Sequence, residues 1–267
     1  MKDGAYRGSA LLTFWLGISM WLHRKMGTFR RVNQYLVLNE KSRDIFLASR
    51  LRLGTKQVVV KPNYVTDEDW QQQTIRKNRR RHFLFIGRLS PEKGIDVLIT
   101  AFTNNGLPLT IIGDGPMRDK VKDLQEKNPL VRWMGYQPKE MINKELKQCT
   151  ALIVPSVCLE GMPLTLVEAF ALSTPAIASR LGGMASIVSH NSNGLLFTPN
   201  DASNLNEQLY HWVALTEDNK HGFGVAARQT YERRYTPEIN FQMLDTIYRD
   251  IIMGRRESTL VNNIPYN

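Results

Sequence analysis

Short apolar runs alternate with stretches of helical spacing along most of the chain. The apolar runs predict strands at 35–38, 58–62, 83–88, 109–115, 131–135, 151–156, 175–179 and 194–197. The stretches between them predict helices at 92–104, 116–127, 138–148 and 163–172, and from residue 202 to about residue 254 the pattern is helical throughout. Strands that are apolar on both faces and separated by helices predict an α/β fold, a doubly wound parallel sheet covered by helices on both faces.

The segment 66–81 interrupts this alternation because it is polar, highly charged and without a period. We interpret it as a linker between domains. Residues 82–235 then form one complete doubly wound domain, and residues 236–267 supply a C-terminal helix and tail. Residues 1–65 hold only two predicted strands, which cannot form an independent sheet of this kind, so we expect them to be part of a second domain.

Charge and hydropathy distinguish the first part of the chain from the rest. Residues 1–81 contain 17 Lys and Arg against 6 Asp and Glu, whereas residues 82–267 contain 18 against 19. The longest apolar stretch, 10–22, is shorter than the roughly twenty residues that a membrane-spanning helix needs, so it predicts a helix that does not span. The basic excess favours contact with an anionic membrane surface or a phosphorylated acceptor, although a solvated linker is the simpler interpretation of the basic run at 76–81. We expect no nucleic-acid partner.

Four loops that follow predicted strands are rich in glycine, at 87–94, 113–116, 158–169 and 179–184. In a doubly wound sheet, ligands bind beyond the carboxyl ends of the strands, and glycine lets the backbone approach them closely. Arg88 and Lys93 flank the first of these loops. Two cations there could neutralise a diphosphate, with a surface pair screened by Glu92 and Asp96 as the alternative.

The loop at 158–169 has a more specific pattern. Pro163 is suited to open a helix, whose free N–H groups would bind a phosphate. Glu168 lies inside that helix, where a carboxylate is better explained as an acceptor for hydroxyl groups such as those of ribose. Glu160 precedes the helix and could accept from the hydroxyls of a second polyol.

Other candidate chemistry is weaker. The loop GDGP at 113–116 is not a G-x-G-x-x-G motif, because Arg118 occupies the place of the third glycine, which argues against a dinucleotide-dependent dehydrogenase. The acidic triplet at 67–69 matches a D-x-D metal motif but falls in the linker, so we assign no metal site.

Three segments together resemble a known family. FIGRLSPEKGIDVLITAF, IIGDGP and PSVCLEGMPLTLVEAFALSTPAIASRLGGMASIV resemble, in order and spacing, the donor-binding domain of retaining, nucleotide-sugar-dependent glycosyltransferases of family 4, whose GT-B fold has two facing Rossmann-like domains. Two glutamates separated by seven residues are the signature of that family, and the resemblance covers 82 to about 200. YRGS, LHRKMGTFRRV and KPN, all before residue 64, are similar to the end of the acceptor domain in the subgroup that builds bacterial capsular polysaccharides and exopolysaccharides.

The resemblance implies a role for each charged residue of these loops. Arg88 and Lys93 would hold the donor pyrophosphate and stabilise charge on the departing nucleoside diphosphate. Glu160 would contact the hydroxyls of the transferred sugar, and Glu168 would bind the nucleotide ribose. No metal or other cofactor is implied, because the two cations and the helix dipole would perform that electrostatic task.

The resemblance also implies roles for uncharged residues. Gly87 would allow close approach of the donor, and the stretch around Tyr136 and Gln137 would lie near the base. The amides that correspond to the docking site of the donor sugar and phosphate are those of Gly161, Met162, Pro163 and Leu164, although Pro163 has no N–H to donate.

The chain also departs from the family pattern. An acidic residue often follows the paired glycines of the family, but Gly182 and Gly183 are followed here by Met184, Ala185 and Ser186. Family members normally begin with a complete acceptor domain that includes a histidine near the transferred sugar, and neither His23 nor His82 stands at a matching position. Only the last part of that domain is recognisable, as if the chain were truncated at its N-terminus.

The resemblance therefore predicts a glycosyltransferase. It would move a sugar from a UDP- or GDP-sugar to a growing, lipid-linked bacterial polysaccharide with retention at the anomeric carbon, in the cytoplasm and peripherally on the inner face of the plasma membrane. The alternative is a donor-binding module or one subunit of a split enzyme, whose protein partner supplies the missing acceptor domain. A phosphorylase or epimerase with the same fold is a less favoured interpretation.

Overall fold

The computed structural model describes residues 9–66 and 82–253, which fall into two compact units. Unit 1 comprises Met1–Lys61 and Asp245–Asn267, and unit 2 comprises Pro62–Leu244. Unit 2 thus begins before the predicted domain boundary at residue 82 and ends after the predicted boundary at residue 235. All of the predicted linker except its first residue, with the acidic triplet and the basic run, lies outside the described residues.

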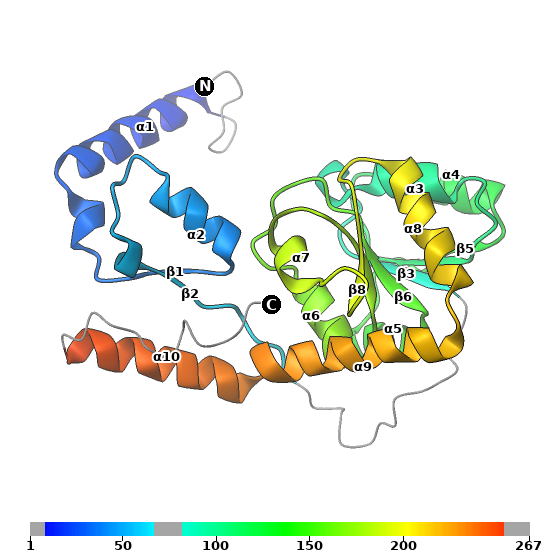
Figure 1. The fold of residues 1–267 in the computed structure, drawn as a ribbon. Coiled ribbons are helices and arrows are strands. Elements are labelled where there is room, and N and C mark those ends of the chain that lie inside the picture. The colour runs from blue at the N-terminus through cyan, green and yellow to red at the C-terminus, as the bar shows by residue number, and fades with distance from the viewer. Residues whose placement is uncertain (1–8, 67–81, 254–267) are drawn as a thin grey trace. The chain divides into compact units, whose positions relative to one another are not determined.

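Unit 2 is built on a sheet of six parallel strands in the order β5-β4-β3-β6-β7-β8 (Figure 1). The strands are β3 (Phe83–Ile86), β4 (Leu109–Ile112), β5 (Val131–Trp133), β6 (Ala151–Val154), β7 (Ala176–Ser179) and β8 (Gly194–Phe197). The helices are α3 (Ile95–Phe102), α4 (Arg118–Lys127), α5 (Lys139–Gln148), α6 (Leu164–Ala171), α7 (Gly182–Ile187), α8 (Ala202–Ala214), α9 (Glu217–Arg234) and α10 (Pro237–Ile252), the last of which continues into unit 1.

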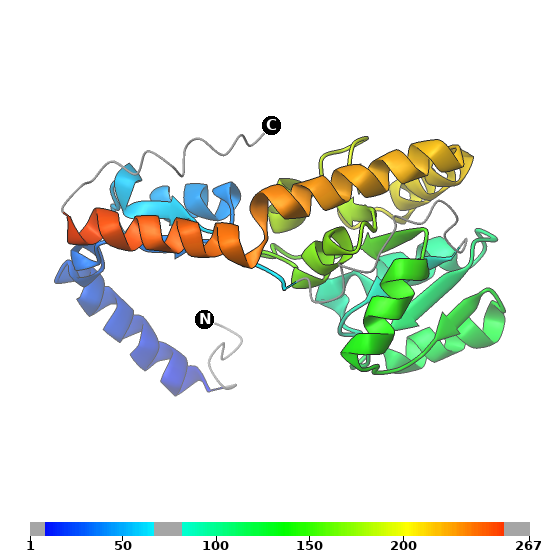
Figure 2. The same cartoon turned by 90° about the horizontal axis from the view of Figure 1, so that it is seen from below.

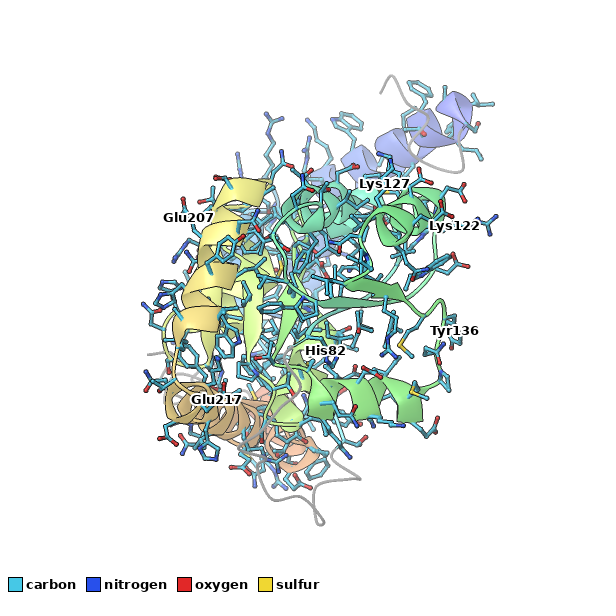
Figure 3. All side chains as sticks on the ribbon, turned by 90° about the vertical axis from the view of Figure 1, so that its right-hand side faces the viewer. His82, Lys122, Lys127, Tyr136, Glu207 and Glu217 are labelled. Carbon is cyan, nitrogen blue, oxygen red and sulfur yellow. The ribbon has the colours of Figure 1, made fainter. Side chains whose placement is uncertain are left out.

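Helices cover both faces of this sheet. Figures 1 and 3 show α3, α4 and α8 on one face and α5, α6 and α9 on the other. Every residue of β4, β7 and β8 is buried, because a strand covered on both faces has no solvent-facing side. The expected doubly wound fold is therefore confirmed.

The order of the strands reverses between β3 and β6. From β3 the chain moves through β4 to β5 at one edge, and it then returns to β6, beside β3, before moving to β7 and β8. Such a reversal leaves a crevice at the carboxyl ends of the two central strands, because the loops that follow them turn to opposite faces. The loops after β3 and β6 are therefore the best placed to bind a ligand.

The helices differ from the prediction in three places. The region predicted to be helical throughout from residue 202 is divided into α8, α9 and α10 by breaks at 215–216 and 235–236. The predicted helix 92–104 is divided into a 3₁₀ turn, η4 (Pro91–Lys93), and α3, with Gly94 between them at φ +73°. A β-carbon at Gly94 would lie 1.9 Å from the Pro155 carbonyl oxygen, so this turn packs directly on the loop after β6. The short helix α7 was not predicted.

At the amino ends of the strands, charged and polar side chains gather around one buried carboxylate. Glu145 of α5 is only 4% exposed, and its carboxylate lies 3.2 Å from His82 Nε2 and 3.0 Å from Arg132 Nη2. Beside it, Trp212 Nε1 donates to Thr150 Oγ1 at 2.8 Å. These bonds join α5, α8 and three strand starts at the edge opposite to the glycine-rich loops.

Unit 1 contains a parallel pair of short strands, β1 (Tyr35–Val37) and β2 (Val58–Val60). The helix α2 (Glu40–Leu47) packs against both strands, as Figure 2 shows. The 3₁₀ turns of unit 1 are η1 (Thr28–Arg31) and η2 (Thr55–Gln57).

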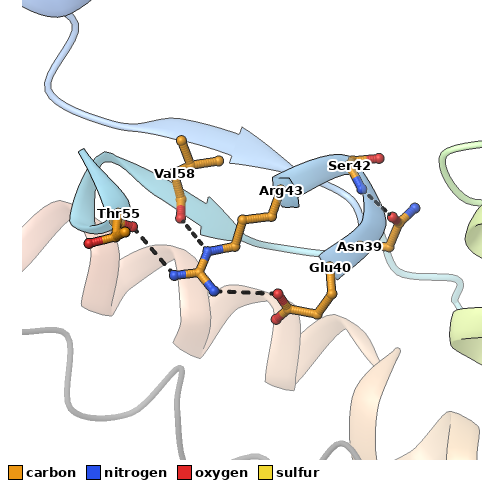
Figure 4. Close-up of polar contacts among 6 residues, drawn as sticks. All are labelled: Asn39, Glu40, Ser42, Arg43, Thr55 and Val58. Carbon is orange, nitrogen blue, oxygen red and sulfur yellow. Dashed lines mark hydrogen bonds and ion pairs between the residues drawn. The ribbon is translucent and has the colours of Figure 1, made fainter. Parts of the chain in front are cut away.

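Polar contacts hold α2 in place (Figure 4). Asn39 Oδ1 caps the helix by accepting from the Ser42 amide at 2.8 Å. Arg43 Nε donates to the Val58 carbonyl at 3.1 Å, and its other nitrogens contact Glu40 and the Thr55 carbonyl. One guanidinium thereby joins α2 to β2 and η2.

The helix α1 (Ala10–Lys25) begins at the Ser9 cap and has no buried residue. It covers the predicted helix 10–22 and the basic turn that follows. Large apolar side chains on it are exposed: Leu11, Leu12, Phe14, Trp15, Leu16, Met20, Trp21 and Leu22. Among the described residues, no helix combines the length and hydropathy that crossing a membrane requires.

Candidate functional site

Five strand-end loops of unit 2 are tied together by backbone hydrogen bonds. The bonds join neighbouring loops in turn: the loop after β5 to the loop after β4, that loop to the loop after β3, then to the loop after β6, and finally to the loop after β7. They run from the amide of Gly113 to Gly135 O, Gly87 to Ile112 O, Leu89 to Asp114 O, Val157 to Glu92 O, and Gly183 to Glu160 O, at 2.7–3.0 Å. These loops therefore form one continuous surface at the carboxyl edge of the sheet.

Glycine makes this close approach possible at two further points. A β-carbon on Gly113, whose φ is +136°, would lie 1.9 Å from the Gly87 carbonyl oxygen. A β-carbon on Gly183 would lie 2.3 Å from the Gly161 carbonyl oxygen. Any larger residue would separate the loops that these contacts join.

Lys93 and Glu160 meet at the reversal of strand order. Lys93 lies in the 3₁₀ turn after β3, and its Nζ is 2.9 Å from Oε2 of Glu160, in the loop after β6. The buried hydroxyl of Ser156 donates to the other oxygen, Oε1. Both oxygens of Glu160 therefore have a donor, and the carboxylate is held in one orientation.

Arg88 is exposed beside this pair. Its charge and that of Lys93 contribute to lowering the pKa of Glu92, although the main cause is the Ser90 hydroxyl, which donates to Glu92 at 2.6 Å. Asp96, the other acidic residue considered as a screen, instead pairs with Lys120 at 2.7 Å. The carboxylates of Glu92 and Asp96 thus contact Ser90 and Lys120, whereas Lys93 pairs with Glu160, the residue predicted to bind the transferred sugar.

The loop after β6 continues into α6 through Pro163. Pro163 is the N-cap with φ −70°, one position before the helix that it was predicted to open, and Leu164 is the first helical residue. Met162 is buried, and its sulfur accepts from the Asn63 amide at 3.2 Å. The first turn of α6 therefore starts beside Glu160, where its N–H groups favour an anion.

Glu168 lies in the second turn of α6 and holds a lysine that sequence reasoning did not find. Its Oε1 is 2.5 Å from Nζ of Lys139, the first residue of α5. No spacing rule could have connected the two residues, because they lie on different helices. The contact requires α5 and α6 to lie on the same face of the sheet.

Tyr136 and Gln137 occupy the loop between β5 and α5. Figure 3 shows Tyr136 at the surface, where it is 83% exposed, and none of the described contacts joins it to Lys93 or Glu160. The Gln137 amide donates to the Met134 carbonyl at 2.6 Å within the loop. These two residues stand apart from the charged cluster, on the side of Lys139.

The chemistry of this edge suits a phosphorylated polyol. Two cations and a helix N-terminus can bind phosphate oxygens, and two carboxylates can accept from hydroxyl groups. Within the described ranges, no three His, Cys, Asp or Glu side chains are grouped as metal ligands.

A family model and curated sequences match this chain. The model for glycosyl transferases group 1 matches residues 66–230, more than half of the chain. An uncharacterized glycosyltransferase of Methanocaldococcus jannaschii is 35% identical over 132 residues, 49% of this chain and 37% of that protein. The amylovoran biosynthesis glycosyltransferase AmsK of Erwinia amylovora is 28% identical over 180 residues, 61% of this chain and 43% of that protein. The chain thus spans less than half of the length of either relative.

Solved structures share the fold. A glycosyltransferase from Rickettsia africae superimposes with a TM-score of 0.74 at 18% identity, over 86% of this chain and 67% of that one. Anabaena HepE, solved in complex with UDP, superimposes with a TM-score of 0.68 at 21% identity, over 81% of this chain and 64% of that one. Identities this low show the fold alone, and that fold is the GT-B type.

Proposed function

The chain belongs to the group 1 glycosyl transferases, and from this premise we propose that unit 2 binds a nucleoside-diphosphate sugar, UDP- or GDP-linked, at the carboxyl edge of its sheet. The observation that carries the proposal is the Lys93–Glu160 pair, formed by the loops after β3 and β6 where the strand order reverses. This is the position at which doubly wound sheets bind nucleotides. Anabaena HepE, which shares the fold, was solved with UDP and with UDP-glucose.

Each charged residue has a role in the proposed reaction. Arg88 and Lys93, with the first N–H groups of α6, stabilise the negative charge that the diphosphate gains as its bond to the anomeric carbon breaks. Glu160 accepts from hydroxyls of the transferred sugar, and Glu168 accepts from the ribose. The chemistry assigned to these residues needs no cofactor.

The acceptor is a growing bacterial saccharide on a lipid carrier. Its hydroxyl oxygen bonds to the anomeric carbon with retention as the bond from that carbon to the diphosphate breaks, and the hydroxyl proton passes to the departing diphosphate oxygen. A saccharide acceptor is supported by AmsK, a relative named for amylovoran biosynthesis, whereas the lipid carrier and retention rest on the family resemblance. Peripheral attachment to the cytoplasmic face of an anionic membrane would bring the chain to such an acceptor, and the exposed apolar side chains and basic end of α1 support it.

Nucleotide binding tests the site assignment. Calorimetric titration of the full chain with UDP and with GDP should show binding of one of them, and Lys93→Ala and Glu168→Ala should each weaken it by about tenfold to a hundredfold, the effect of losing a charged hydrogen bond. Lys120→Ala is the matched control, because this lysine is 61% exposed and pairs with Asp96. If both site variants bound as tightly as the control, the assignment would be wrong.

A second candidate function is a donor-binding module that turns over only with a separate acceptor domain. It is favoured by the two-stranded sheet of unit 1 and by the absence of any buried residue on α1. Release of UDP or GDP from a nucleotide sugar by the purified chain in the presence of a lipid-linked saccharide would exclude it.

A further inference from the structure

The ion pair between Lys139 and Glu168 joins the first residue of α5 to the second turn of α6. Lys139 is 50% exposed and Glu168 is 24% exposed, so both side chains are open to a ligand. Among the described contacts, Glu168 Oε1 receives the lysine, whereas none is recorded to Oε2. A hydroxyl group could therefore reach this carboxylate without displacing Lys139.

Stability alone does not explain this pair. Ion pairs as exposed as this one contribute little to folding, because solvent screens them and ordering the long side chains costs entropy. The position of the Lys139 backbone is nonetheless well defined. Two backbone hydrogen bonds hold the loop that precedes Lys139. Met134 N donates to Ile111 O of β4 at 2.9 Å, and Gly113 N, in the loop after β4, donates to Gly135 O at 2.8 Å.

A carboxylate beside an ammonium group matches both hydrogen-bonding functions of a hydroxyl. A hydroxyl donates one hydrogen bond and accepts others, whereas an ionised carboxylate only accepts and an ammonium group only donates. A Glu168 carboxylate alone would leave the ribose oxygens without a protein donor.

We propose that Lys139 is a specificity-determining residue for the nucleotide. Its ammonium group donates a hydrogen bond to a ribose hydroxyl, and that hydroxyl in turn donates a hydrogen bond to the Glu168 carboxylate. The proposal rests on the assignment of Glu168 to the ribose under the proposed function. Because Lys139 directly follows the loop that carries Tyr136 and Gln137, it also connects the predicted base-binding loop to the ribose site.

Deoxynucleotides test this inference. The full chain and its variants would be titrated calorimetrically with the diphosphate that the wild type binds, UDP or GDP, and with its 2′-deoxy and 3′-deoxy forms. The wild type should prefer the ribonucleotide to at least one deoxy form. Lys139→Met should lower affinity for the ribonucleotide by about tenfold while changing affinity for that deoxy form by less than about threefold. Lys139→Arg, which keeps the charge and donors, should retain part of the preference.

Lys144→Met is the matched control, since it removes the same charge from an exposed position of the same helix. It should bind all three nucleotides as the wild type does, and both methionine variants should melt at similar temperatures. An unchanged ribose preference in Lys139→Met would overturn the inference while leaving nucleotide binding intact. A wild-type chain that binds no nucleoside diphosphate would instead refute the proposed function.

Discussion

At the scale of single residues, each signature glutamate is paired with a lysine. Glu160 holds Lys93 and Glu168 holds Lys139, and in each case the lysine comes from another strand-end loop or helix. Each ion pair orients the carboxylate that it includes, which lowers the cost of ordering that side chain during binding. The proposed site is therefore preorganised by ion pairs.

Ser156 is expected to act on the sugar through Glu160. Ser156 is 1% exposed, its hydroxyl donates to Glu160 Oε1, and Ser156→Ala would leave that oxygen without this donor. Affinity for the bare diphosphate should change by less than threefold, whereas the affinity that the sugar adds should fall by about tenfold, as expected for one charged hydrogen bond. Titration with UDP and UDP-glucose, or with GDP and GDP-mannose, measures both quantities.

Ser156→Thr keeps the hydroxyl and should restore the sugar contribution. Ser186→Ala, on α7, removes a half-buried hydroxyl that donates to the Gly182 carbonyl and serves as the control. Equal losses of diphosphate and sugar-diphosphate affinity in Ser156→Ala would instead indicate a general structural defect.

The sequence predicted some of these residues and not others for a physical reason. Arg88, Lys93 and Glu160 lie in strand-end loops and Glu168 lies in the helix that follows one of them, where the local pattern is informative. The contacts of Lys139 depend on the packing of α5 beside α6, which no local spacing encodes.

At the scale of elements, the glycine contacts predict how the loops respond to substitution. Gly113→Ala places a β-carbon against the Gly87 carbonyl at a backbone φ of +136°. It should lower the free energy of unfolding by about 2–4 kcal/mol through overpacking and backbone strain, and it should weaken nucleotide binding. Urea denaturation and titration with the bound diphosphate measure the two effects.

Gly222→Ala is the control, and it should change the free energy of unfolding in the opposite direction. Gly222 lies inside α9, and a β-carbon there meets nothing within 4 Å. Alanine favours the helix by about 0.5–1 kcal/mol over glycine, so this variant should be slightly more stable. Equal stability of the two variants would show that the Gly113 contact does not constrain the loops.

Elements were predictable where the apolar pattern was continuous. All eight predicted strands are present, because each lies in a largely apolar run between breaks in hydropathy. The helix α7 was missed because its sequence, GGMASI, is too short for a helical period and begins with two glycines. The break at Gly94 was missed because its cause, the Pro155 carbonyl, is distant in the sequence.

At the scale of the whole molecule, the uneven charge and the exposed apolar side chains of α1 predict membrane binding. Residues 1–81 hold 17 of the 35 basic residues, and Trp15 and Trp21 are 59% and 49% exposed. The chain should co-sediment with vesicles of phosphatidylglycerol and phosphatidylcholine at low salt, and less at 0.5 M salt, where charges are screened within about 4–5 Å.

Replacing both tryptophans by serine should abolish most of this binding. Phe241→Ser, which removes a 69% exposed apolar side chain from α10, should not affect it. Equal sedimentation of the double variant and this control would exclude α1 as the membrane contact.

The ionic cluster of Glu145, His82 and Arg132 has a consequence for how this fold can change. It lies at the amino edge of the sheet, whereas all the residues proposed to touch the donor belong to the carboxyl edge. Substitutions at sites with no shared partners act almost independently on free energy. Directed evolution of a new donor specificity can thus be confined to the loops after β3, β5 and β6. Substitutions that raise the free energy of unfolding, to compensate for losses in those loops, can be sought at the amino edge of the sheet.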